Sequence, residues 1–234
     1  MRYKSELGLL KMQTKQPQPP SEKAILRALG EFQLAANSSQ VLQIQQYIAL
    51  LLKWNDKINL TAIRDPLEIL YRHFCESMFG AVVMSLETCR LADVGSGGGF
   101  PGLPMKIIHP EIDLVLIESN VKKATFLTEV VRELGLNGVR VLVSRYEELS
   151  EEVAPLDVIC SRAVGEFGPF LQWAGASGLG AQKVALWIGG QDAELVRQIP
   201  GWIWAESRPI PHSLRRFILV GSPQPEPEPA KPSK

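Results

Sequence analysis

Apolar positions recur along this chain with two different periods, and the change between them falls near residue 90. Before that point they are spaced three or four residues apart, which is typical of helices that bury one face. The predicted stripes are Ile25, Leu29 and Phe32 within residues 22–36, Val41, Ile44, Ile48 and Leu51 within residues 39–54, and Leu70, Phe74, Met78 and Val82 within residues 65–85. Asp65, Pro66 and Glu68 form a typical helix start, because they supply a capping acid, an N1 proline and an acid in the first turn.

After residue 90, short continuous apolar runs alternate with helical patterns. Such runs are typical of strands that are buried on both faces. Strands are expected at 90–94, 113–118, 139–143, 156–160, 183–188, 203–207 and 216–220, with helices that begin near Pro101, Val121, Glu166 and Gly190. The alternation predicts an α/β fold with a doubly wound, mostly parallel sheet that follows an N-terminal helical extension.

The ends of the chain are polar and rich in proline, and a composition of this kind cannot bury an apolar face. We therefore expect a disordered basic tail at 1–21 and a disordered proline-rich tail at 221–234. Between them lie the helical extension at 22–86 and the sheet-containing core at 87–220.

Composition narrows the class of protein. The chain has 234 residues, 45% of them hydrophobic, and a formal net charge of zero, which suits a globular enzyme with a sizeable core. Three cysteines without a C-x-x-C pair and three scattered histidines encode neither a disulfide framework nor a metal site. No apolar stretch is long enough to cross a membrane, so we expect a cytoplasmic protein that does not bind membranes and acts as a monomer.

The densest chemical signal is a glycine-rich loop after the strand at 90–94. Asp93, Gly95, Gly97 and Gly99 form the pattern D-x-G-x-G-x-G, and glycines in this density suit a backbone that turns sharply against a ligand. A dinucleotide loop would aim N–H groups at a pyrophosphate, but Pro101 has no N–H. An acid beside the loop instead favours a cofactor that carries positive charge and no phosphate, such as S-adenosylmethionine.

Two further strand ends carry charged residues that suit a nucleoside site. Glu118 ends the second strand about 20 residues beyond the loop, where an acid commonly binds ribose hydroxyls. Arg162 follows the apolar fourth strand, and an arginine in such a place needs either a structural carboxylate such as Asp93 or a ligand acceptor. Because the carboxyl ends of parallel strands meet at one edge, these residues are expected to lie close together.

Several motifs together resemble one particular family. They are Trp54-Asn55-x-x-Ile58-Asn59-Leu60-Thr61-x-x-Arg64-Asp65, Arg72-His73, the loop extended to Gly99-Phe100-Pro101-Gly102-Leu103-Pro104, Lys122-Lys123 with Phe126-Leu127, and Ser161-Arg162-Ala163. Over roughly residues 40–220 the chain is similar to the glucose-inhibited division protein B family, also called RsmG. The resemblance implies a Rossmann-like, S-adenosylmethionine-dependent methyltransferase that acts on N7 of a guanine in bacterial 16S ribosomal RNA.

The resemblance also implies roles for individual residues. It implies cofactor contacts from Gly95, Phe100, Tyr146, Glu147 and Arg162, and Arg162 is the expected catalytic residue. The glycine loop and the strand-end acid add Ser96, Gly97 and Glu118 to the expected cofactor contacts. Substrate contacts are expected from Asn59, Thr61, Arg64, Arg72 and His73, which would lie where 16S ribosomal RNA or the small ribosomal subunit approaches. Phosphate contacts are expected from Arg64, Arg72, Arg208, Arg215 and Arg216.

The chain departs from the family pattern at two places. Ile188 stands where relatives often have a lysine, and the usual acid-serine pair appears as Glu76-Ser77. Two other functions therefore stay open. One is a methyltransferase of a small molecule or protein, which a closed apolar pocket over residues 59–73 would favour. The other is a non-catalytic module that binds S-adenosylmethionine, which the missing lysine permits.

Overall fold

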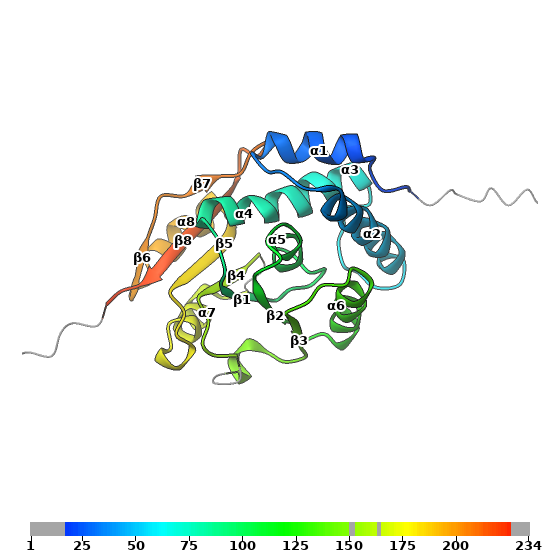
Figure 1. Ribbon diagram of the computed structural model, residues 1–234. Helices are drawn as coiled ribbons and strands as arrows, with labels where there is room; N and C mark the ends of the chain where they lie inside the picture. The colour runs from blue at the N-terminus through cyan, green and yellow to red at the C-terminus, as the bar shows by residue number, and fades with distance from the viewer. Residues whose placement is uncertain (1–16, 150–152, 163–164, 226–234) are drawn as a thin grey trace, which may run out of the picture.

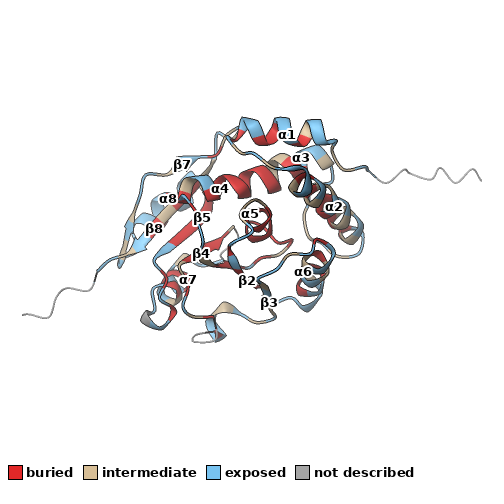
Figure 2. Ribbon diagram, viewed as in Figure 1, coloured by how far each residue is buried: buried red, intermediate tan, exposed pale blue. Residues whose placement is uncertain are grey.

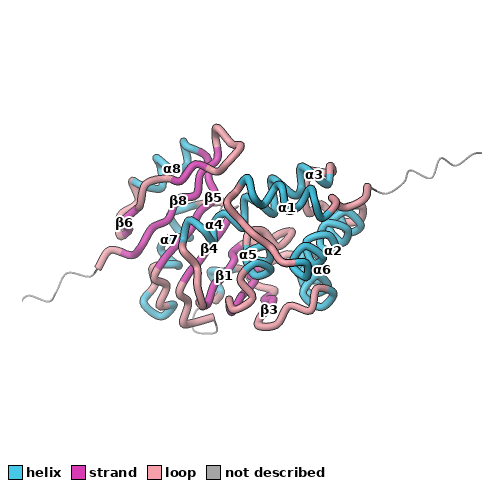
Figure 3. The backbone as a smooth tube through the Cα atoms, turned by 45° about the horizontal axis from the view of Figure 1, so that its top comes forward, coloured by secondary structure: helices cyan, strands magenta, loops and turns pink. Residues whose placement is uncertain are grey.

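The computed structural model describes residues 17–149, 153–162 and 165–225, and these residues form one central sheet with helices on both faces (Figures 1 and 3). The strands are β1 (Arg90–Val94), β2 (Asp113–Ile117), β3 (Val139–Leu142), β4 (Val158–Ser161), β5 (Lys183–Gly189), β6 (Trp202–Trp204), β7 (Arg208–Pro209) and β8 (Arg216–Pro223). Their order is β3-β2-β1-β4-β5-β8-β6, and β7 pairs with β8. The first five strands in this order are parallel to one another, whereas β8 runs antiparallel to β5. The predicted doubly wound, mostly parallel sheet is thus confirmed.

The helical segments are α1 (Glu22–Glu31), α2 (Ser38–Asn55), α3 (Pro66–Ile69), η1 (Leu70–Cys75), α4 (Glu76–Met84), α5 (Gly102–Ile108), α6 (Val121–Glu133), η2 (Tyr146–Glu148), α7 (Phe167–Ala174), η3 (Ser177–Leu179) and α8 (Gly190–Arg197). Local chemistry fixes their starts. Asn37 and Gln40 form a reciprocal capping box before α2, and the Asp65 side chain accepts the Glu68 N–H before α3, as the sequence predicts.

The sheet divides two apolar layers, because alternate residues of a strand point to opposite faces. One face packs against α2, α4, α5 and α6, and the other packs against α7 and α8. In β1, for example, Leu91 belongs to the first layer and Ala92 to the second. Figure 2 shows α4 and α5 as almost wholly buried helices, so the N-terminal extension shares its core with the sheet.

Three expectations about the helical extension and the last strands need correction. The first helix stops at Glu31 instead of Ala36, because Gln33 adopts a left-handed φ of 59°. The third expected helix is split by the π-helical turn η1, and Val82 is 41% exposed. The predicted stripe has a spacing of four residues, and each such step turns the side chain by about 40° around the helix axis. Val82, its fourth member, therefore no longer points to the buried face. The single strand expected at 203–207 is replaced by the shorter β6 and the separate β7.

The C-terminal boundary of the core also moves. We expected the core to end at residue 220, but β8 continues to Pro223 and pairs with Trp202 of β6. At the other end, the Pro20 carbonyl accepts a hydrogen bond from Gln45. The expected tails at 1–16 and 226–234 lie outside the described residues. Within the described part of the chain, no helix has the length and apolar character needed to cross a membrane.

Candidate functional site

The glycine loop after β1 has the backbone that its composition predicts. Gly95, Gly97 and Gly99 all have left-handed φ angles, of 70°, 57° and 87°. A Cβ on Gly99 would collide with the hydroxyl of Tyr47 and with Leu103. That hydroxyl donates a 2.5 Å hydrogen bond to the Gly98 carbonyl, so helix α2 holds the loop from behind.

Glu118 fastens the same loop to β2. Its two carboxylate oxygens each lie 2.8 Å from a backbone N–H, one of Gly97 and one of Asn120, and the residue is buried. The hydroxyl of Ser96 donates a 2.8 Å hydrogen bond to the Asp93 carbonyl and is buried as well. In this structure Glu118 and Ser96 are thus parts of the loop's framework, and neither lines the cavity described next.

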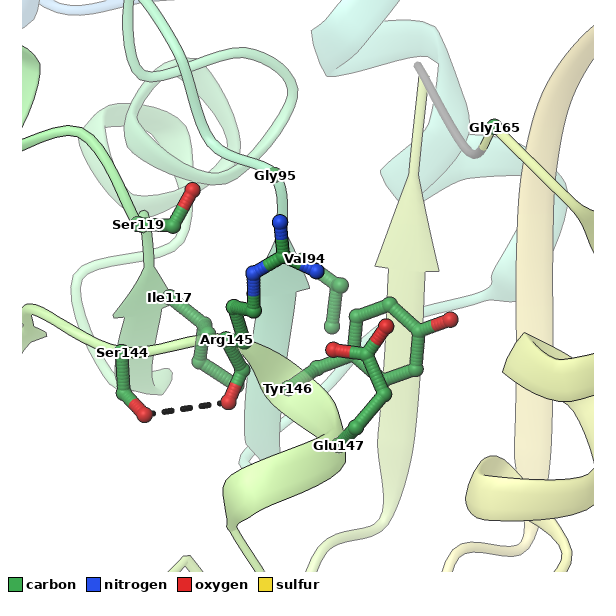
Figure 4. A pocket seen from close by; sticks show the side chains of 9 residues that line it. All are labelled: Val94, Gly95, Ile117, Ser119, Ser144, Arg145, Tyr146, Glu147 and Gly165. Atoms are coloured by element: carbon green, nitrogen blue, oxygen red, sulfur yellow. Dashed lines mark hydrogen bonds between the residues drawn. The ribbon is translucent and has the colours of Figure 1, made fainter.

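A cavity of about 200 Å³ opens at the carboxyl ends of β1, β2 and β3. Its lining consists of Val94, Gly95, Ile117, Ser119, Ser144, Arg145, Tyr146, Glu147 and Gly165 (Figure 4). In the sheet, β2 and β3 lie on one side of β1, and β4 and β5 lie on the other side. The cavity therefore lies at the point where the strand order reverses. We call it the loop cavity. It contains three of the predicted cofactor residues, namely Gly95, Tyr146 and Glu147.

Phe100, which the resemblance assigns to the cofactor, is not part of that lining. Its ring stacks between two aromatic side chains of the extension, with centroids 5.6 Å from Tyr47 and 4.7 Å from His73. The His73 Nε2 lies 2.6 Å from the Thr61 hydroxyl. Burial, with Arg162 and Arg72 nearby, lowers the pKa of His73 to about 3, so the ring is neutral near pH 7.

Asp93 does not line the loop cavity either, although we expected from the sequence that its carboxylate lies beside the ligand. Its Oδ2 accepts a 2.9 Å hydrogen bond from the N–H of Gly102, and its Oδ1 is buried without a hydrogen-bond partner among the described residues. Complete burial raises the pKa of Asp93 to about 7, against a smaller opposing effect of the Gly102 hydrogen bond. Gly102 is required here because a Cβ would lie 2.9 Å from that of Asp93.

Arg162 does have a carboxylate partner, but the partner is Glu76 and not Asp93. Its Nη2 lies 3.6 Å from Glu76 Oε2, and it also donates to the Arg72 carbonyl at 3.1 Å. The buried Glu76 receives two more cations, because Arg216 binds it bidentately at 2.6 and 3.2 Å and Arg72 Nε lies 3.7 Å away. Three arginines therefore share one buried carboxylate, and Arg72 also pairs with the exposed Glu68 at 3.4 Å, so the ion-paired group carries a formal excess of one positive charge.

A second cavity, of about 260 Å³, lies against this cluster. It is lined by Ser161, Arg162, Phe167, Leu186, Trp187, Ile188, Gly189, Asp192 and Arg216, and we call it the arginine cavity. Cys160 of β4 pairs in register with Asp93 of β1, so the ends of these strands lie side by side. The segment after β4 contributes Arg162 to the arginine cavity and Gly165 to the loop cavity. The two cavities are therefore neighbours along one edge of the sheet.

The remaining predicted substrate residues form a separate group. Asn59, Thr61 and Arg64 line a cavity of about 330 Å³, and Arg64 pairs with Asp56 at 3.2 Å in an exposed ion pair. The Asn55 amide holds this turn together, because its Oδ1 accepts the Thr61 N–H at 3.0 Å. The structure thus brings Thr61 into contact with His73, and Arg72 into contact with Glu76. The five predicted substrate residues do not form one cluster.

Two residues tie the extension to the site, and sequence reasoning gave neither of them a role. Tyr47 looks like an ordinary core position, and Glu76 was noted only as the acid of the family's acid-serine pair. The position of Glu76 amid apolar neighbours was a further signal, since buried acids are rarely left unpaired. Among the described residues, no group of three or more His, Cys, Asp and Glu side chains is placed so that it could hold a metal ion.

Comparison with known proteins identifies close relatives. Residues 40–194 match the family model described as "GidB: rRNA small subunit methyltransferase G". Proteins named "Ribosomal RNA small subunit methyltransferase G" are similar to this chain. The one from Pseudomonas syringae pv. syringae (strain B728a) is 47% identical over 56% of this chain and 60% of its own length. The one from Dichelobacter nodosus is 37% identical over 68% of this chain and 74% of its own length. The chain spans between 58% and 66% of the length of three Pseudomonas relatives.

Solved structures share the fold at low sequence identity. A SAM-dependent methyltransferase from Aquifex aeolicus superposes with a TM-score of 0.52 at 17% identity, over 67% of this chain and 93% of that chain. A mutant of MtNAS in complex with S-adenosylmethionine gives 0.52 at 13% identity, over 79% of this chain and 76% of that chain. These likenesses confirm the predicted Rossmann-like α/β fold.

Proposed function

Because this chain belongs to the family of rRNA small subunit methyltransferase G, we propose that it transfers a methyl group from S-adenosylmethionine to N7 of a guanine in 16S ribosomal RNA. The observation that carries the proposal is the pair of neighbouring cavities at one sheet edge, one suited to a nucleoside and one lined by arginine. We further propose that the protein acts as a monomer, since the described residues of one chain line both cavities, and that it acts in the cytoplasm, where its proposed RNA substrate lies.

The loop cavity fits the nucleoside part of S-adenosylmethionine. The Glu147 carboxylate can accept a hydrogen bond from the adenine amino group, and the Tyr146 ring offers an apolar face to the base. Gly95 has no side chain in the way of a ligand that approaches the backbone. When bound, the cofactor supplies an electrophilic methyl group on its sulfonium sulfur.

The acceptor needs little chemical help from the protein. N7 of guanine is an unprotonated lone pair, so methyl transfer to it requires no general base, and the neutral His73 and the buried Cys75 need not act as one. What the reaction requires is alignment of N7 with the methyl group at near-attack distance. The arginine cavity, with the apolar Phe167 and Ile188 in its walls, suits a base that is held against the loop cavity.

Arg162 is the residue we assign to that alignment. It lines the arginine cavity and precedes Gly165 of the loop cavity in the chain, and Glu76, Ser77 and the Arg72 carbonyl fix its guanidinium. A guanidinium held at several points is preorganised to orient a ligand oxygen or base edge. In this proposal Glu76 acts through Arg162 and is a positioning residue.

The proposal is tested by methyl transfer in vitro. The purified protein is incubated with labelled S-adenosylmethionine and either protein-free 16S ribosomal RNA or small ribosomal subunits from cells that lack this gene. The RNA is then digested and its nucleosides are identified by mass spectrometry. We expect 7-methylguanosine at one position. Label in protein or in small molecules would overturn the RNA assignment, and cofactor binding without any transfer would favour the non-catalytic module.

A further inference from the structure

The turn between β7 and β8 lies beside the arginine cavity and has an unusual composition. Residues 208–216 read Arg-Pro-Ile-Pro-His-Ser-Leu-Arg-Arg and include no acid. Arg216 pairs with Gly189, the last residue of β5, so the turn lies at the same carboxyl edge of the sheet as both cavities. Figure 1 shows this orange segment running from β7 to the end of α1.

The turn is held in one conformation by its own hydrogen bonds. Ser213 donates its N–H to the Ile210 carbonyl at 3.1 Å, and its hydroxyl accepts the N–H groups of Arg216 at 3.0 Å and Arg215 at 3.4 Å. Ile210 is buried and anchors the segment. His212 Nε2 lies 3.2 Å from a Glu31 carboxylate oxygen. The tip is therefore preorganised, which lowers the entropy lost when it binds a partner.

This fixed turn presents one apolar and two cationic side chains to solvent. Leu214 is 99% exposed, whereas the next most exposed large apolar side chain of the described residues, Val121, is 66% exposed. Arg208 and Arg215 are exposed, and no described side chain pairs with either of them. A rigid element that exposes an apolar side chain between cations suits a partner with apolar faces and negative charge, as nucleic acid has.

We propose that the turn is an RNA-contacting arm in which Leu214 packs against the bases beside the target guanine while Arg208 and Arg215 contact phosphates. The inference rests on the proposed function and adds an element that the cavities alone do not require. A guanine must leave its stack to enter a cavity at the sheet edge, and an apolar side chain inserted beside it stabilises the opened stack. Leu214 suits this role because its side chain is exposed and it lies in the same turn as Arg216, which lines the arginine cavity.

The test compares five variants with wild type on protein-free 16S ribosomal RNA. Leu214→Ala is expected to lower kcat/KM roughly tenfold, because the shortened side chain no longer packs against the bases beside the target guanine, whereas Leu214→Met, which keeps a long apolar side chain, is expected to retain most of the activity. Leu42→Ala is the matched control. Leu42 is 54% exposed on α2, whose Gln40 and Gln43 bind carbonyls at the C-terminal ends of α5 and α6, so it lies near the opposite edge of the sheet.

The predicted phosphate contact is tested with Arg215→Glu, and Lys183→Glu is its control. Lys183 is the first residue of β5 and so lies at the amino edge of the sheet, away from the turn. We expect only Arg215→Glu to weaken RNA binding and to reduce the slope of log K against log salt by about one or more. Melting temperature and affinity for S-adenosylmethionine should stay at wild-type values in all five variants. If wild type methylates RNA and Leu214→Ala stays within twofold of it, the arm is refuted and the proposed function stands. If wild type transfers no methyl group to RNA, both proposals fall.

Discussion

Two groups beside the glycine loop, the buried Asp93 and the half-buried His73, are expected to give the protein opposite responses to pH, and single substitutions should separate them. Asp93 has a raised pKa of about 7, and His73 has a lowered pKa of about 3. Desolvation is the larger cause in both cases. Arg162 is the charge common to both environments, Glu118 also acts on Asp93, and Arg72 also acts on His73.

The direction in which each group changes the free energy of unfolding with pH depends on whether the folded or the unfolded state binds its proton more tightly. The folded state holds the Asp93 proton more tightly than the unfolded chain does, so its stabilising contribution is complete below pH 3.8 and is lost as the pH rises to about 7. The folded state holds the His73 proton less tightly, so its contribution is complete above pH 6.5 and is lost as the pH falls towards 3. In their shared window the two effects oppose each other, each with a limiting slope of about 1.4 kcal/mol per pH unit.

The measurement is the free energy of unfolding in urea at about pH 5 and about pH 6.5 for wild type, Asp93→Asn and His73→Gln. Asparagine keeps an acceptor for the Gly102 N–H. Over this interval each single effect amounts to about 2 kcal/mol at most. Relative to wild type, Asp93→Asn should therefore gain stability as the pH rises, and His73→Gln should lose it. Curves for the two variants that run parallel to wild type within about 0.5 kcal/mol would refute this account of burial.

Three further outcomes are expected. Glu76→Gln should lower the free energy of unfolding by about 3 kcal/mol, because it removes a buried partner of three arginines; the melting temperature would then fall by roughly 6–12 °C, whereas breaking the exposed pair with Asp56→Asn should shift it by less than about 2 °C. Gly99→Ala should abolish binding of S-adenosylmethionine in calorimetry, because the added Cβ meets Tyr47 and Leu103; Gly135→Ala, which also has a positive φ but open space around it, should bind normally. Arg162→Lys should stay folded and lose at least tenfold in kcat, since a point charge cannot replace the planar fork; wild-type turnover per folded molecule would exclude a role in alignment.

Local patterns were enough to predict the elements that surround the site. The period of the apolar residues located the parallel strands, and the left-handed φ angles of Gly95, Gly97 and Gly99 are what a glycine-dense loop predicts. These features depend on residues that are close in sequence. The same is true of the Asp65 cap and the start of α3.

Contacts between distant segments were not predictable in this way. Glu76 and Arg216 are 140 residues apart, and their bidentate pair exists only because β8 returns antiparallel beside β5 and under α4. The sequence left Asp93 as a candidate partner of Arg162, since both end neighbouring strands. In the structure the partner is Glu76, which lies 3.6 Å from Arg162 Nη2, whereas Asp93 binds the N–H of Gly102 at the start of α5.

The aromatic stack of Tyr47, Phe100 and His73 changes how the extension should be understood. Tyr47 reaches 51 residues along the chain to bind the Gly98 carbonyl, and Phe100 fills the space between the other two rings. An apolar residue after the glycine loop can therefore affect cofactor affinity without facing the loop cavity, because it fixes the backbone that forms the cavity wall. The helices before residue 86 are in this sense part of the site: if they were removed, both the Tyr47 hydrogen bond and the Phe100 stack would be lost, and the loop would keep only its attachment to Glu118 and the sheet.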